Sequence, residues 1–105
     1  MKKIGLLIVL ATISINIMAQ KKIIQTAGHD KLGEFAPEFA HLNDDILFGE
    51  VWNKQDALSV KQRCLITVIS LVSQGITDSS LKYHIQNAKN NGVTLKEMAD
   101  TLTQV

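Results

Sequence analysis

The 105-residue sequence predicts an all-α fold. Over much of the chain, apolar residues recur at spacings of three and four, the period of a helix with one buried face. Helix-start and helix-stop residues stand at the ends of these segments, including two capping boxes and two glycine stops. No segment shows the apolar–polar alternation and turn residues that predict a strand. We therefore expect helices joined by short loops.

The first nineteen residues have the layout of a secretory signal peptide. Lys2 and Lys3 give a basic start, residues 4–17 are almost wholly apolar, and Ala19 supplies the small residue that a signal peptidase requires. The apolar run is shorter than the roughly 20 residues of a membrane span. We expect cleavage after Ala19 and export, to the periplasm or out of the cell, with no membrane attachment afterwards. An uncleaved N-terminal anchor is the alternative.

The remaining 86 residues suit one domain with a modest core, which oligomerisation would help to stabilise. Removing Lys2 and Lys3 takes the formal charge from +1 to −1, so a nucleic-acid partner is not expected. Cys64 is the only cysteine, which excludes an internal disulfide, a CxxC motif and a cysteine-rich metal site. His29 and His41 show no metal-ligand spacing with the third histidine and are interpreted as surface residues.

Residues 20–30 show no clear period and are predicted to be a flexible N-terminal segment ahead of a helical domain over 31–105. Asp30 can cap a helix that begins near Lys31. Pro37 interrupts the helical pattern and predicts a break near Ala36, followed by a second short helix over Asp44–Val51. The apolar face expected before this second helix consists of Leu32, Phe35, Phe39 and Leu42.

The next helix is predicted from Ser59 to about Gln74. Ser59 and Gln62 form a capping box, and Gly75 supplies the C-terminal stop. Its apolar residues cover most sides, which predicts a central, buried helix. They are Val60, Cys64, Leu65, Ile66, Val68, Ile69, Leu71 and Val72.

Two more helices follow. Thr77 or Asp78 is expected to cap the first, which presents Leu81, His84, Ile85 and Ala88 on one face. Gly92 is predicted to end this helix, with Val93 packing back on Ala88. A second capping box, Thr94 with Glu97, then starts the last helix at Leu95, and Val93 with Met98 makes the matching hydrophobic staple.

Four segments in the second half of the chain form an ordered set. They are Phe48-Gly49-Glu50-Val51-Trp52, Lys61-Gln62-Arg63-Cys64-Leu65-Ile66-Thr67, Leu81-Lys82-Tyr83-His84, and Asn90-Asn91-Gly92-Val93-Thr94 with Glu97. In order and spacing, over residues 35–105, they resemble the carboxymuconolactone decarboxylase family of the wider alkylhydroperoxidase D-like superfamily. The resemblance implies an all-α helical bundle built round a helical hairpin, a homo-oligomer (trimer or hexamer), and an activity that needs no cofactor.

The resemblance also implies roles for single residues. His84 stands at the place of the family's proposed acid–base residue, and the alternative is a core histidine with a satisfied hydrogen bond. Glu50, a carboxylate among apolar residues, is the expected partner of His84, or else a surface carboxylate. Arg63 could bind a substrate carboxylate in a bidentate contact, or be an ion-paired surface arginine. These three residues form the candidate catalytic and substrate-binding set.

Two departures from the family's pattern bear on function. Peroxidase-like members carry a glutamate where this chain has Cys64, and a CxxC motif just before the histidine, where this chain has none. Cys64 is therefore interpreted as a small packing residue. The family also continues beyond the position of Val105 into a further helix, so the sequence is expected to be truncated relative to the family.

Together these features predict an exported, cofactor-free lyase that decarboxylates a small carboxylated lactone or a related acid. In such a reaction His84 would deliver a proton and Glu50 would orient it. Two alternatives remain open at this point. One is a peroxidase or antioxidant protein (peroxiredoxin activity), and the other is a non-catalytic helical oligomer.

The export prediction can be tested directly. Protein recovered from the cell envelope or medium should begin at Gln20, as read by N-terminal sequencing or intact mass. Recovery with Met1 still attached would show that the segment is an uncleaved anchor.

Overall fold

The computed structural model describes residues 21–105, so the predicted signal peptide lies outside the described part. Six helical segments follow one another: α2 (Ala27–Leu32), α3 (Pro37–Ala40), η1 (His41–Val51), α4 (Val60–Ser73), α5 (Ser79–Asn90) and α6 (Leu95–Thr103). No strand occurs among residues 21–105, which confirms the all-α prediction. None of the helices described is long and apolar enough to cross a membrane.

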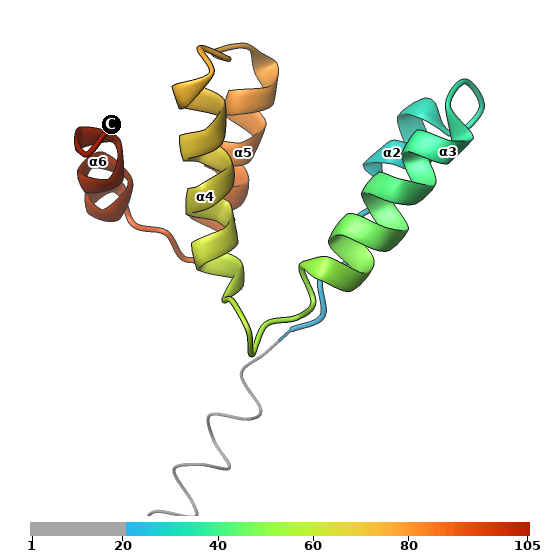
Figure 1. Cartoon of the computed structure of the whole chain (residues 1–105), viewed down its shortest axis with the longest axis horizontal. Coiled ribbons are helices and arrows are strands. Elements are labelled where there is room, and N and C mark those ends of the chain that lie inside the picture. Colours follow the sequence, from blue (N-terminus) through green and yellow to red (C-terminus); the bar gives the residue numbers. More distant parts are fainter. Residues whose placement is uncertain (1–20) are drawn as a thin grey trace, which may run out of the picture.

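The helices form two arms that diverge from a common base (Figure 1). In one arm, α2 packs against α3 and η1. In the other, α4 and α5 form an antiparallel hairpin, and α6 packs against α4. The loop from Trp52 to Ser59 joins the arms at the base. The hairpin expected from the family resemblance is therefore present.

The helical pattern is interrupted close to the predicted position. α2 ends at Leu32, a turn covers residues 33–35, and Pro37 starts α3 as its first residue, where the missing N–H has no helical partner to lose. α3 then continues into η1, an 11-residue π-helical segment. The second helix thus begins seven residues before the predicted Asp44, because proline favours the first turn of a helix.

The start of α2 corrects another expectation. The helix begins at Ala27 instead of near Lys31, so part of the predicted flexible segment is helical. Asp30 lies inside the helix and does not cap it. The preceding residue, Thr26, makes no side-chain capping bond either. The cap comes from another helix, through Asp44 of η1.

Asp44 is 2% exposed and binds the first turn of α2 with both carboxylate oxygens. Oδ1 accepts a hydrogen bond from the Gly28 N–H (3.0 Å), and Oδ2 accepts one from the His29 N–H (2.8 Å). Asn43 Nδ2 also donates to Oδ1, at 2.8 Å. Burial raises the pKa of Asp44, but the hydrogen bonds from His29, Asn43 and Gly28 outweigh it and hold the pKa below the usual range.

Gly28 is required by this close approach. A Cβ atom at this position would stand 2.6 Å from Asp44 Oδ1 and 3.2 Å from the Cα of Ala40. The first contact is too short for a Cβ atom, and the second is tight. The interaction thus locks the backbone of α2 onto η1.

The apolar face predicted before η1 is not buried in this chain. Phe35 is 90% exposed and Phe39 is 56% exposed, and Leu32 and Leu42 are also exposed. The turn at 33–35 splits the pattern between two helices, so the four side chains do not share one face. The prediction that they form a buried stripe was wrong for this reason.

The hairpin follows its local sequence signals. Ser59 Oγ accepts from the Gln62 N–H, and Gln62 Oε1 accepts from the Ser59 N–H, which confirms the capping box. Asp78 caps α5 by accepting from the Ser80 N–H at 2.9 Å. The two glycine stops, Gly75 and Gly92, adopt φ of 74° and 90°. Such angles favour glycine, because a Cβ atom is strained there.

The core lies at the base of the molecule. Phe48 and Trp52 of the first arm pack together, with ring centroids 4.9 Å apart. They belong to one buried cluster with residues of the second arm: Cys64, Ala88 and Val93. Val93 is held there by its N–H, which donates to the carbonyl of Ala88 at 3.0 Å, as the predicted packing requires.

α4 is less buried than predicted. Only Cys64 and Val68 of this helix are buried, and Ile66 is 54% exposed. α6 covers part of α4 through the partly buried Met98 and an ion pair between Lys61 Nζ and Glu97 Oε2 at 2.7 Å. The second capping box is confirmed, since Thr94 and Glu97 exchange both bonds.

The hydrogen bonds of Asp44 to α2 predict that replacing this one side chain lowers the stability of the fold. Asp44→Asn should lower the melting temperature by roughly 5 °C or more, because an amide cannot accept from both N–H groups of α2. Asp100→Asn, the same change on an exposed carboxylate of α6, is the matched control. Since the pKa of Asp44 is depressed in the folded state, its contribution is present above about pH 3.8 and is lost as the pH falls below that value.

Thermal unfolding followed by circular dichroism at neutral and acidic pH measures both effects. Equal decreases in melting temperature in Asp44→Asn and Asp100→Asn would show that the α2 cap is not important for stability.

A second prediction concerns the link between α4 and α6. The hydrogen bond from Lys61, together with those from Thr94, lowers the pKa of Glu97 from 4.5 to about 2. The stabilisation that ionised Glu97 contributes through these bonds is thus complete above about pH 4.5 and is lost as the pH falls towards 2. Lys61→Gln should move the pKa of Glu97 back towards 4.5, as read by NMR titration. Lys96→Gln should leave it unchanged, and an unaltered titration in Lys61→Gln would contradict the ion pair.

Candidate active site

His84 lies in the first half of α5, on the side that faces the first arm. Its side chain is half-buried, and this burial lowers the pKa of the imidazole below its usual value of 6.5. No hydrogen bond within residues 21–105 contributes to the shift. The ring packs edge-on against Tyr83, with centroids 5.1 Å apart and an interplanar angle of 87°. His84 is therefore mainly neutral at pH 7, and none of the residues that the structure describes fixes its tautomer by a hydrogen bond.

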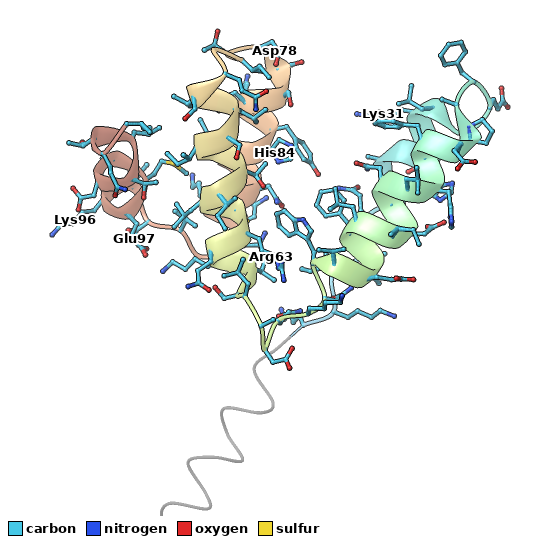
Figure 2. All side chains as sticks on the ribbon, viewed as in Figure 1. Lys31, Arg63, Asp78, His84, Lys96 and Glu97 are labelled. Atoms are coloured by element: carbon cyan, nitrogen blue, oxygen red, sulfur yellow. The ribbon has the colours of Figure 1, made fainter. Side chains whose placement is uncertain are left out.

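A groove of about 590 Å³ opens between the arms beside His84. α2 and η1 form one wall, through residues that include Lys31, Asn43 and Phe48. The start of α5 forms the other wall, through Ser79, Ser80, Tyr83 and His84. Figure 2 shows the side chains of Lys31 and His84 extending from their helices towards the space between the arms. The volume suits a small organic molecule.

Tyr83 connects the two walls. Gln25 Nε2, in the segment before α2, donates a hydrogen bond to the Tyr83 hydroxyl at 2.9 Å. Because the hydroxyl accepts this bond, its own proton remains free to be donated. The groove thus contains a proton-exchanging imidazole beside a phenolic donor.

Glu50 and Arg63, the other predicted site residues, do not line this groove. Glu50 is exposed on η1, and no hydrogen bond or ion pair joins it to His84 in the described part of the chain. Arg63 Nη2 donates to the carbonyl of Lys54 at 3.2 Å, and its Nε is buried without a partner. Arg63 therefore lies at the base of the arms, below the groove (Figure 2). Their predicted roles stay predictions.

Cys64 is a buried core residue, as predicted. It is 1% exposed, and Asn87 Nδ2 approaches its Sγ at 3.8 Å. Burial raises the pKa of the thiol, which keeps it protonated at neutral pH. The geometry favours packing over thiol chemistry.

His29 and His41 are on the surface, as interpreted from the sequence, but they share a partner. Asp45 lies between them, 3.0 Å from His29 Nε2 and 2.9 Å from His41 Nδ1. These hydrogen bonds, from His41 first and then His29, hold the pKa of Asp45 below its usual range. Within residues 21–105 no group of three such side chains could hold a metal ion.

Sequence reasoning missed two residues of the groove. Tyr83 could have been found, because it precedes His84 in the same motif and carries a hydroxyl. Lys31 had no such signal, since it lies 53 positions from His84 and reaches the groove only through the fold.

The burial of Cys64 yields a further prediction. Thiol reagents should label the folded protein slowly, and Cys64→Ala should cost about 1 kcal/mol of stability. Reaction with a chromogenic disulfide reagent in native buffer and in denaturant measures the difference. Rapid labelling of the native protein with loss of activity would instead support a thiol mechanism.

The comparisons with known proteins agree with this structure. The sequence model of the carboxymuconolactone decarboxylase family matches residues 37–105, about two-thirds of the chain. Comparison with curated proteins and with solved structures gave no match. The matched region contains α3, η1 and the α4–α5 hairpin with His84. The chain therefore belongs to the carboxymuconolactone decarboxylase family.

Proposed function

We propose that the protein is a cofactor-free carboxy-lyase that acts on a small carboxylated lactone or a related acid. The observation that carries the proposal is the position of His84, half-buried in a groove between two helical arms without a partner for its ring. Family membership supports a decarboxylase-like activity. The signal-peptide layout supports action outside the cytoplasm, on an acid available there.

The reaction requires one proton and no redox change. The bond between the carboxyl carbon and its neighbour breaks, CO₂ leaves, and the electron pair is delocalised into the lactone carbonyl as an enolate. The imidazolium form of His84 then gives its proton to the carbon atom and regains one from water. The Tyr83 hydroxyl, whose proton remains free, is a candidate donor to the enolate oxygen.

The pKa of His84 sets the expected pH dependence. Because burial lowers this pKa, the imidazolium fraction in the free enzyme falls as the pH rises through a value below 6.5. If protonated His84 is the acid, kcat/KM should fall over the same range. Lys31 and Tyr83 are the other ionisable side chains that line the groove.

The proposal includes self-association. Large apolar side chains are exposed on both arms and on α6, among them Phe35 at 90% and Leu95 at 86%. Contact between copies would bury such side chains and support the homo-oligomer expected from the family. Assembly would also add walls to a groove that is open in one chain.

The peroxidase alternative has less support. The only cysteine of the sequence is buried, and its thiol is held in the protonated form. A cysteine-based peroxidase needs an accessible thiolate and a partner thiol. A peroxide-consumption assay with a dithiol reductant distinguishes the two activities. The non-catalytic oligomer is favoured only by the exposed apolar side chains, and variants of His84 test it.

The decisive variants are His84→Gln and Glu50→Gln. His84→Gln should abolish decarboxylation of the responsive acid in a screen of lactone acids and β-keto acids, with helicity and oligomeric size unchanged. Glu50→Gln should reduce turnover and shift its pH profile only if Glu50 acts on His84. In that case the variant removes a negative charge that raises the pKa of the histidine.

Glu38→Gln, the same change on an exposed carboxylate of α3, is the matched control. Full activity in His84→Gln would refute the assignment. Loss of assembly in that variant would indicate a structural histidine instead.

A further inference from the structure

We propose that Lys31 binds the carboxylate of an anionic ligand in the groove and positions the ligand against His84. The proposal rests on the proposed function, because it concerns the same groove. Lys31 is a positioning residue here, and it lies on α2, before the segment that matches the family.

The charges around the groove carry the argument. Lys31 is the only side chain with a permanent charge among those that line the groove, and no carboxylate lines it within residues 21–105. Lys31 also forms no ion pair in the described part of the chain, whereas Lys61 is paired with Glu97. Because the groove is lined by this cation and by no carboxylate of the described residues, its lining favours an anion.

The rest of the lining is suited to the remainder of the same ligand. Ser79 and Ser80 supply hydroxyl groups on the opposite wall, at the start of α5, whereas Leu32 and Phe48 supply apolar surface on the same wall as Lys31. Asp78, the N-cap of α5, is outside the lining, and its carboxylate already accepts from the Ser80 N–H. A ligand whose carboxylate contacts Lys31 would therefore present the rest of the molecule to the α5 wall, which includes His84.

Arg63, the cation expected to bind substrate, does not line this groove. Its guanidinium is used by the Lys54 carbonyl at the base of the arms. Lys31 is instead held at the groove because α2 is locked onto η1 through Asp44. Within this groove, the proposed anion-binding residue therefore lies on α2.

The chemistry also fixes which carboxylate is bound. An ion pair to the carboxylate that departs as CO₂ would stabilise the ground state and slow the reaction. Lys31 therefore binds a carboxylate that stays on the molecule. Its loss should raise KM and leave kcat nearly unchanged.

The test uses paraconate, a γ-lactone with one carboxylate, and its uncharged methyl ester. Paraconate should shift the NMR signals of Lys31 and of the start of α5, and the ester should not. Lys31→Gln should weaken paraconate binding at least about tenfold, the size of one charge-assisted hydrogen bond. Lys31→Arg should retain binding, and Lys96→Gln, on α6, should match the wild type.

The outcomes separate this proposal from the proposed function. Paraconate binding should survive in His84→Gln, which loses turnover. Equal affinity in Lys31→Gln and Lys96→Gln, or equal binding of the ester, would overturn the role of Lys31 even if decarboxylation is found. Binding that depends on Lys31 in a protein that decarboxylates none of the screened acids would support the anion site and refute the lyase.

Discussion

The bond between Asp44 and the start of α2 is the contact on which the site depends. A short helix of six residues has little stability of its own, since helix nucleation is costly. Here two N–H groups of its first turn are satisfied by one buried carboxylate from η1. The carboxylate is stabilised mainly by hydrogen bonds, with a smaller electrostatic contribution from His29, and together they keep it ionised despite its burial. This bond therefore helps to fix the position of α2 opposite α5, together with the contact of His29 with Asp45.

The second arm is organised in a different way. The α4–α5 hairpin is specified by caps at both ends, and each cap comes from residues adjacent in sequence. It presents His84 on the side that faces α2. Asn53 reinforces the junction between the arms, because its side chain bonds both the N–H and the carbonyl of Ile23. The groove is therefore the product of one arm built from local signals and one built from long-range bonds.

The small core of this chain explains why assembly into an oligomer would stabilise it. The buried cluster of Phe48, Trp52, Cys64, Ala88 and Val93 is modest, and several large apolar side chains remain at the surface. A chain of this size gains stability when copies cover such side chains. The proposed decarboxylation would benefit from assembly as well, because exclusion of water strengthens the effect of a charge on a nearby reacting group.

The sequence by itself determined the helices whose ends carry local signals. The capping boxes at Ser59 and Thr94 and the glycine stops at 75 and 92 act within a few residues, so pattern reasoning placed them correctly. It also identified His84 as the candidate residue and Cys64 as a packing residue. The exposure of Phe35 was not predictable from the pattern, because it depends on how the turn at 33–35 sets one helix against the next.

Only the tertiary structure decided which residue caps α2 and which side chains line the groove. Asp44 bonds residues 15 and 16 positions away, and Lys31 meets the groove of a histidine far along the chain. Such pairs follow no helical period, since they join elements whose relative placement comes from packing. The same reason separated Arg63 from the groove, although Arg63 and His84 belong to neighbouring motifs.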